Sequence, residues 1–289
     1  MATAVENQLV VIAESAEAPR SLRLQMPACH GIDIEDLSIT QLQKCLIERK
    51  FSTRDLVETY LKRIEQLNGL LKRVPAVIQV NIDALTIAEC LDDELENCKL
   101  RSPLHGIPFL VKDNIATKDS METTAGSMMP IGATVPQDAH VVSLLRDAGA
   151  ILLGHANLSE WAAMRSINSS EGYSYRRSQC RNPYNLAEHP GGSSCGITVA
   201  VVTNMCAFRL GTETDGSVMI AADRNAVAGI KPTVGLISIK GVIPESSSLD
   251  TVGPFGKTVL DAITSGFKSD ESSHKTNKDG VGFITGGYK

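Results

Sequence analysis

The sequence predicts an α/β protein in which a mixed or parallel β-sheet is covered by helices. Short apolar runs typical of buried strands alternate along the chain with longer stretches whose apolar residues recur at helical spacing. The chain has 289 residues, 43% of them hydrophobic, which is enough for one large domain with a substantial core. We expect an irregular extension over residues 1–30, a core domain over 31–265 and a polar tail over 266–289.

Two helix starts are expected near the beginning of the core domain. Residues 40–43 fit a T-x-x-Q capping box, and residues 52–55 fit the related S-x-x-D signal. After the second signal, the apolar residues of 56–67 recur at helical period. The Asn-Gly pair at 68–69 is expected to end that helix.

Strands and helices alternate from residue 76 onward. The strand over 106–115 is expected to be buried on both faces, because its apolar run is nearly continuous. The stretch ITVAVVTNM at 197–205 fits either a helix or a strand. The other expected elements are strands over 76–80 and 150–154, helices over 84–97 and 139–148, and a strand that runs into a turn over 206–217.

Charge, hydropathy and cysteine spacing exclude several classes of function. The net charge is -5 and there is no run of Lys and Arg, which argues against a nucleic-acid partner. No apolar stretch approaches the roughly 18 residues of a membrane span, and the N-terminus lacks the basic start of a signal peptide, so we expect a cytoplasmic protein. The seven cysteines form no C-x-x-C pair and are expected to be free thiols, with no metal site.

The stretch EHPGGSSCG at 188–196 is the first candidate for chemistry. It lacks the Gly-Lys-Ser/Thr of a phosphate loop and the G-x-G-x-x-G of a dinucleotide site. Residues 192–196 fit the G-x-S-x-G elbow of α/β-hydrolases, but the segment before them contains two prolines and does not resemble a strand. Only His274 lies downstream, in the polar tail, so a Ser-His-Asp enzyme is disfavoured.

Two further features carry candidate chemistry, and each has an ordinary structural alternative. Lys112 ends the buried run GIPFLV, and burial lowers a lysine pKa enough for it to act as a base. The alternative is a structural lysine paired with Asp113 or another acid. The turn GTETDGS at 211–217 can gather backbone N–H groups around an anion, or it can be an ordinary turn with a capping serine.

Taken in order along the chain, these features resemble the amidase signature family. Lys112 lies in VKDN, Ser193 and Ser194 lie in GGSSCG, and Ser217 lies in GTETDGS, 24 residues after Ser193. The resemblance covers most of the chain, from about residue 35 to 263, and is greatest to the plant and bacterial peptide-amidase-like branch. Further matching stretches are LHGIPFLVKDNI, TTAGS, GHANLSEWA, RNPYN, VAGIKPTVGLIS and GVIPESSSLDTVGPFGKTVLDA.

The resemblance implies a mixed sheet sandwiched between helices and a Ser–cis-Ser–Lys triad. Ser217 is then the nucleophile, and Ser193 is the bridging serine after a cis peptide bond from Gly192. Lys112, neutral in the resting state, is the base. Ser194 is expected to donate to or accept from Lys112 and to orient it.

The implied reaction is hydrolysis of a carboxylic amide through an acyl-enzyme, on a small-molecule amide and without a metal or organic cofactor. The alternatives are a weak or inactive amidase-like protein with a binding role, and an amidotransferase A-type subunit that needs a partner chain. The oxyanion is expected to be held by the backbone N–H groups of Thr214, Asp215, Gly216 and Ser217.

The sequence also departs from the family pattern. Cys195 and Ile197 replace small residues after the serine pair, and larger side chains there are expected to crowd the proton relay. Met219 and Ala221 take places that often hold arginine and proline, and His155 stands where many relatives have lysine.

Length is the largest departure from the family. Full members continue well beyond the TVGPFGKTVLDA stretch, so the resemblance implies a fold that is incomplete at its C-terminus. An exposed apolar patch or an open sheet edge is then expected to lead to self-association.

Overall fold

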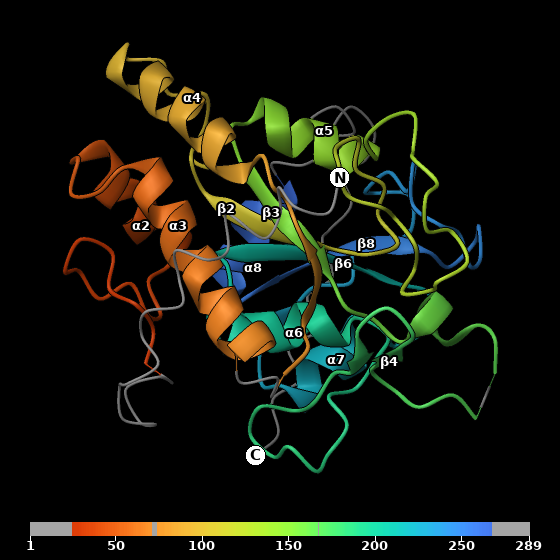
Figure 1. The fold of residues 1–289 in the computed structure, drawn as a ribbon. Helices are drawn as coiled ribbons and strands as arrows, with labels where there is room; N and C mark the ends of the chain where they lie inside the picture. The colour runs from red at the N-terminus through yellow and green to blue at the C-terminus, as the bar shows by residue number, and fades with distance from the viewer. Residues whose placement is uncertain (1–24, 71–73, 167, 268–289) are drawn as a thin grey trace.

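The fold is a mixed β-sheet with helices packed against it (Figure 1). The computed structural model describes residues 25–70, 74–166 and 168–267. Within these residues, the main sheet has six strands in the order β1-β3-β2-β6-β8-β7. The strands are β1 (Val77–Val80), β2 (Pro108–Lys112), β3 (Ile151–Ala156), β6 (Phe208–Glu213), β7 (Ala228–Gly229) and β8 (Thr251–Gly256).

Strand directions make the sheet mixed and bring three strand ends together. β3, β2 and β6 run parallel, whereas β1, β8 and β7 each pair antiparallel with their neighbours. The predicted α/β class is therefore confirmed. Because parallel strands end on the same side of a sheet, residues that follow β2, β3 and β6 lie close together.

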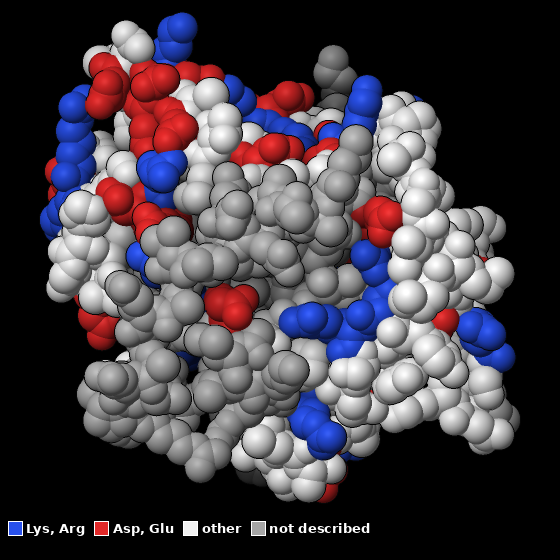
Figure 2. Space-filling model, in the orientation of Figure 1, with Lys and Arg blue, Asp and Glu red and all other residues white. Residues whose placement is uncertain are grey.

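Helices cover the sheet above and below in the view of Figure 1, with α4 and α5 above it and α6 and α7 below. On the face drawn in Figure 2, red and blue atoms are interspersed, and acidic side chains gather over α4. The helices are α2 (Ile39–Ile47), α3 (Thr53–Ile64), the π-helical η3 (Glu65–Leu70), α4 (Ala84–Glu96), α5 (His140–Asp147), the short η4 (Glu160–Ala163), α6 (Cys195–Val202), α7 (Met219–Arg224) and α8 (Val259–Phe267). A two-stranded sheet of β4 (Tyr173–Ser174) and β5 (Ser178–Gln179) lies apart from the main one.

The first helix starts at a different capping box from the predicted one. Ser38, not Thr40, is the N-cap of α2: its hydroxyl accepts from the N–H of Gln41, whose side chain accepts from the N–H of Ser38. The N–H of Ile39 donates to Asp261 on α8 at 2.9 Å, which holds the helix start at this position. The second predicted box, over residues 52–55, is confirmed at the start of α3.

The Asn68-Gly69 pair does not end the helix that follows Ser52. The chain continues as η3 to Leu70, because the Asn68 side chain hydrogen-bonds to β1 instead of capping the helix. Its amide donates to the carbonyl of Val77 at 2.9 Å and accepts from the N–H of Val77 at 3.0 Å, which fixes the start of β1.

The stretch that fitted either a helix or a strand is α6, an eight-residue helix with all but its last residue buried. It packs against β6 and β2, and a helix enclosed on all sides has no polar face to show its period.

Much of the predicted N-terminal extension over 1–30 and C-terminal tail over 266–289, including His274, lies outside the described residues. α8 continues to Phe267, two residues past the predicted core boundary. Within the described part of the chain, no helix has the length and apolar character needed to cross a membrane.

Candidate active site

The three predicted catalytic side chains meet at the ends of β2 and β6. Lys112 is the last residue of β2, and Ser217 lies in the turn just after β6. Ser193 comes from the segment before α6, where the peptide bond between Gly192 and Ser193 is cis, as the resemblance implied. The three residues therefore come from three separate parts of the chain.

A continuous hydrogen-bond chain joins the three residues. Nζ of Lys112 donates to Oγ of Ser193 at 2.6 Å, and Oγ of Ser193 donates to Oγ of Ser217 at 2.8 Å. Oγ of Ser217 also accepts from the N–H of Ser193 at 3.1 Å. Lys112 is fully buried, whereas 3% of Ser193 and 6% of Ser217 is exposed, so only the serine end of the chain reaches the surface.

Burial sets the basicity of Lys112. Desolvation lowers its pKa from the usual 10.5 to about 8, although the negative charge of Glu245 acts in the opposite direction. Its other hydrogen-bond partners are uncharged: Nζ donates to Oγ1 of Thr212 at 2.9 Å and to the carbonyl of Thr212 at 3.3 Å. Among the described residues, Lys112 forms no ion pair, so the alternative of a structural lysine paired with an acid is wrong.

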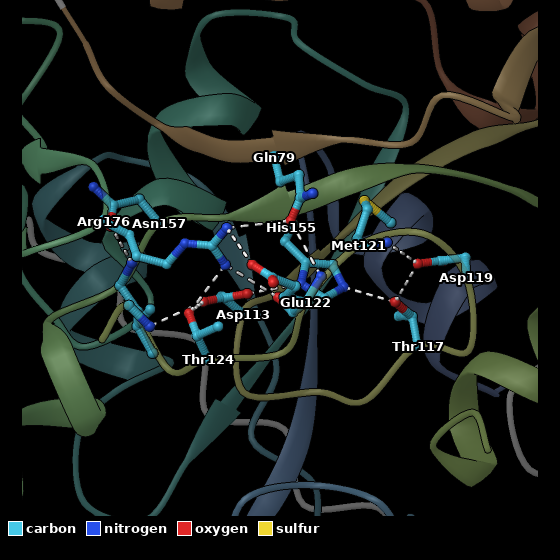
Figure 3. Close-up of polar contacts among 12 residues, drawn as sticks. Gln79, Asp113, Thr117, Asp119, Met121, Glu122, Thr124, His155, Asn157 and Arg176 are labelled. Atoms are coloured by element: carbon cyan, nitrogen blue, oxygen red, sulfur yellow. Dashed lines mark hydrogen bonds and ion pairs between the residues drawn. The ribbon is translucent and has the colours of Figure 1, made fainter. Parts of the chain in front are cut away.

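Asp113 instead pairs with His155 (Figure 3). Nδ1 of His155 lies 2.7 Å from Oδ1 of Asp113, and Oδ2 of Asp113 accepts from the hydroxyl of Thr124 at 2.6 Å. Nε2 of His155 lies 2.8 Å from Oγ1 of Thr117. All four residues are buried. His155 is therefore the partner of this acid, and it ties β3 to the residue after Lys112.

Ser194 does not bind Lys112 directly, which differs from our expectation. Its hydroxyl donates to the carbonyl of Thr212 at 3.1 Å, the same carbonyl that Lys112 approaches. The residue before Thr212, Gly211, leaves room for this position, because a Cβ there would lie 2.8 Å from Oγ of Ser194. Ser194 therefore packs against β6, and its link to Lys112 runs through Thr212.

The turn that carries Ser217 is held by Glu213, the last residue of β6. Its carboxylate accepts from the N–H groups of Gly216 at 2.9 Å, Val218 at 2.6 Å and Met219 at 2.8 Å. Burial raises the pKa of Glu213, but these three N–H groups and Lys231 outweigh it, and the pKa is lowered. The N–H of Gly216 is thus already occupied, which corrects its assignment as a free oxyanion donor.

Cys195 lies beside the relay without entering it. The residue is fully buried, and its thiol contacts the thiol of Cys180. Burial, together with this contact, raises the pKa of Cys180. The hydrogen-bond chain from Lys112 to Ser217 is complete despite the larger residues at 195 and 197, so the expected crowding is not seen. All seven cysteines are free, as predicted.

Sequence reasoning missed two residues of the site. Glu213 and Lys231 lie 3.3 Å apart as an ion pair, and Lys231 also donates to the carbonyl of Thr214 at 3.0 Å. Both residues fall inside stretches that carried the family resemblance, so their position was a signal, but nothing in the residue pattern assigned them to each other. Within the described part of the chain, His, Cys, Asp and Glu form no group that could hold a metal ion.

Comparison with known proteins places the chain in one family. The model of the family named Amidase matches residues 55–273, which is more than half of the chain. The protein therefore belongs to the amidase family.

Individual relatives agree with this assignment. A relative from Schizosaccharomyces pombe whose name describes an amidase is 56% identical over 238 residues, covering 82% of this chain and 40% of the relative. The crystal structure of the peptide amidase from Stenotrophomonas maltophilia has a TM-score of 0.77 and 44% identity, covering 80% of this chain and 47% of that one. An amidase family protein from Bacillus anthracis has a TM-score of 0.80 and 33% identity, covering 90% and 51%. The chain thus spans about half the length of the relatives it matches.

Proposed function

We propose that this protein hydrolyses a carboxylic amide through an acyl-enzyme, with Ser217 as nucleophile, Ser193 as bridging serine and Lys112 as base. The observation that carries the proposal is the chain of two short hydrogen bonds from Nζ of Lys112 through Ser193 to Oγ of Ser217. Membership of the amidase family supports the reaction class.

Acylation begins with neutral Lys112, which takes a proton from Ser193 while Ser193 takes one from Ser217. The oxygen of Ser217 attacks the amide carbonyl carbon, and its negative charge passes to the carbonyl oxygen. When the C–N bond breaks, the proton returns through Ser193 to the leaving nitrogen. Ammonia or an amine departs, and the acyl group remains on Ser217.

Deacylation uses the same relay with water as the nucleophile. The water gives its proton to the relay as it attacks the acyl carbon, and Ser217 regains a proton when the acid leaves. Each half of the reaction returns Lys112 to its neutral form. The pKa of about 8 is what makes this base available near neutral pH.

The substrates we propose are small amides, including peptide amides. The similarity to the peptide amidase from S. maltophilia favours the second group. A panel of aliphatic, aromatic and peptide C-terminal amides, assayed for released ammonia, identifies the preferred acyl group.

Replacement of the nucleophile tests the proposal. Ser217→Ala is expected to abolish amide hydrolysis, and Ser143→Ala in α5 is the matched control that should keep full activity. A fluorophosphonate probe should label the wild type at Ser217 and leave Ser217→Ala unlabelled. Hydrolysis that persists in Ser217→Ala contradicts the proposal. Wild-type protein that neither hydrolyses amides nor takes the label favours a binding role.

We also infer self-association through one side of the sheet. β7 pairs only with β8 among the described strands, and the neighbouring helices expose Ile220, Val259 and Leu260, at 47%, 48% and 60% of their surface. Leu260→Asp should reduce the mass measured by light scattering. Leu100→Asp, at an exposed site that is distant from these residues in the sequence, should not. An unchanged mass for Leu260→Asp contradicts this surface.

A further inference from the structure

Three successive peptide groups in the turn after β6, from Thr214 to Ser217, each have one polar atom held by a hydrogen bond. The carbonyl of Thr214 accepts from Nζ of Lys231 at 3.0 Å, and the carbonyl of Gly216 accepts from the N–H of Ile220 at 2.7 Å. Between them, the N–H of Gly216 donates to Glu213 at 2.9 Å. These contacts decide which way the remaining N–H groups point.

In a trans peptide the carbonyl and the N–H of one unit point in opposite directions. The Thr214 carbonyl and the Asp215 N–H belong to one such unit, and the Gly216 carbonyl and the Ser217 N–H belong to another. The N–H of Asp215 therefore points away from Lys231, and that of Ser217 points away from Ile220. Within residues 25–70, 74–166 and 168–267, neither N–H has a hydrogen-bond acceptor.

Lys231 is itself held in place. It follows β7, and the N–H of the residue before it donates to the carbonyl of Pro254 on β8 at 3.1 Å. Its ammonium lies 3.3 Å from Glu213, whose side chain is only 4% exposed. One lysine thus joins the carboxylate that orders the turn and the carbonyl at the start of the turn.

We infer that Lys231 is a positioning residue for the oxyanion site: by holding the Thr214 carbonyl, it aims the N–H of Asp215 at the oxygen that becomes negative in the transition state. The inference rests on the proposed function of Ser217. Of the predicted donors that remain once Gly216 is occupied by Glu213, Asp215 and Ser217 have their peptide groups fixed, by Lys231 and by the first turn of α7. A donor held before the reaction needs no reorganisation when the charge forms.

The test separates transition-state binding from folding. In Lys231→Met, the affinity for an alkyl boronic acid, which forms a tetrahedral adduct with a serine, should fall about tenfold to a hundredfold, less than the 10²–10³ that complete loss of a donor costs. The affinity for a simple carboxamide that is bound but not turned over should change less than about twofold, since ground-state binding does not use this donor. In an active enzyme kcat should fall by the same factor as the boronic acid affinity, at nearly constant KM.

Three variants serve as references. Lys231→Arg keeps a cationic donor and should recover most of the boronic acid affinity, and Lys231→Leu, which also lacks a donor, provides a second measurement if Lys231→Met does not fold. Lys99→Met removes an exposed lysine elsewhere and should match the wild type.

Equal boronic acid affinity in the wild type and in a folded Lys231 variant without the cation overturns the inference. So does an equal loss for the boronic acid and the carboxamide, which indicates a purely structural role. Boronic acid binding is measured by calorimetry and needs no turnover. Either of these outcomes is therefore distinct from failure of the proposed function, which is decided by Ser217→Ala.

Discussion

The buried lysine of the relay should destabilise the protein at neutral pH, and Lys112→Met should reveal this. Lys112 has no exposed surface, and burial lowers its pKa from 10.5 to about 8. The two values differ by roughly 2.5 pH units, and at about 1.36 kcal/mol per unit, protonating this lysine in the folded state costs about 3 kcal/mol relative to the unfolded chain. Methionine has a similar length and no charge, so the variant avoids this cost.

The sign of the pH dependence follows from proton binding. Below pH 8, folded and unfolded wild type both carry the proton, and the full cost is present. Between pH 8 and 10.5 the unfolded chain keeps the proton while the folded protein has lost it, so wild-type stability rises with pH. Above 10.5 neither state carries it, and the cost is gone. The variant also loses the hydrogen bonds of Nζ, but that loss does not vary across this range.

The assay is urea unfolding of wild type and Lys112→Met at intervals from pH 7 to 10.5. The unfolding free energy of the wild type minus that of the variant should increase by about 3 kcal/mol over this range. Lys99→Met, at an exposed lysine, should give a difference that is constant with pH. A constant difference for Lys112→Met would refute the reasoning, because it means that the folded-state pKa of Lys112 is ordinary and that it is not a base near pH 8.

Four further outcomes follow from contacts at the site and at the start of α2. The kcat/KM of the wild type should rise about tenfold per pH unit up to the pKa of Lys112 and then level off, since only the neutral lysine accepts a proton. Glu245→Gln removes a negative charge that raises this pKa and should move the whole profile to lower pH; an unchanged profile contradicts this. In urea unfolding, Ser38→Ala should cost about 1 kcal/mol as a lost N-cap and Thr40→Ala less than half of that, and the reverse order contradicts the observed helix start. Glu213→Gln should lower kcat by a larger factor than it changes KM, because the turn loses the charge that collects three N–H groups. A change in KM as large as the change in kcat speaks against this role.

Periodicity predicted the elements well where a single pattern was present. The helix expected over 84–97 is Ala84–Glu96, and the strand expected over 106–115 contains β2 at Pro108–Lys112. The start of α2 was wrong because two capping patterns overlap there, and the choice between them is made by Asp261, more than two hundred residues away. Local sequence does not contain that contact.

The candidate site shows the same division. The resemblance to the amidase signature family, carried by the ordered motifs, predicted that Lys112, Ser193 and Ser217 come together. The partner of Ser194 and the occupied N–H of Gly216 were not predictable in this way. Both depend on acceptors whose position is set by β6 packing against its neighbours.

Two lysines near the end of β6 show how surroundings decide a role that residue type leaves open. Lys112 has hydroxyl and carbonyl partners and no exposed surface, so the cost of its charge suits it to the proposed role of base. The side chain of Lys231 is 29% exposed and paired with Glu213, so it serves as a donor that fixes a carbonyl. The apolar run before Lys112 was a sequence signal for the first role. No local signal exists for the second, because it depends on a peptide plane at Thr214 that is distant in sequence and adjacent only in the folded sheet.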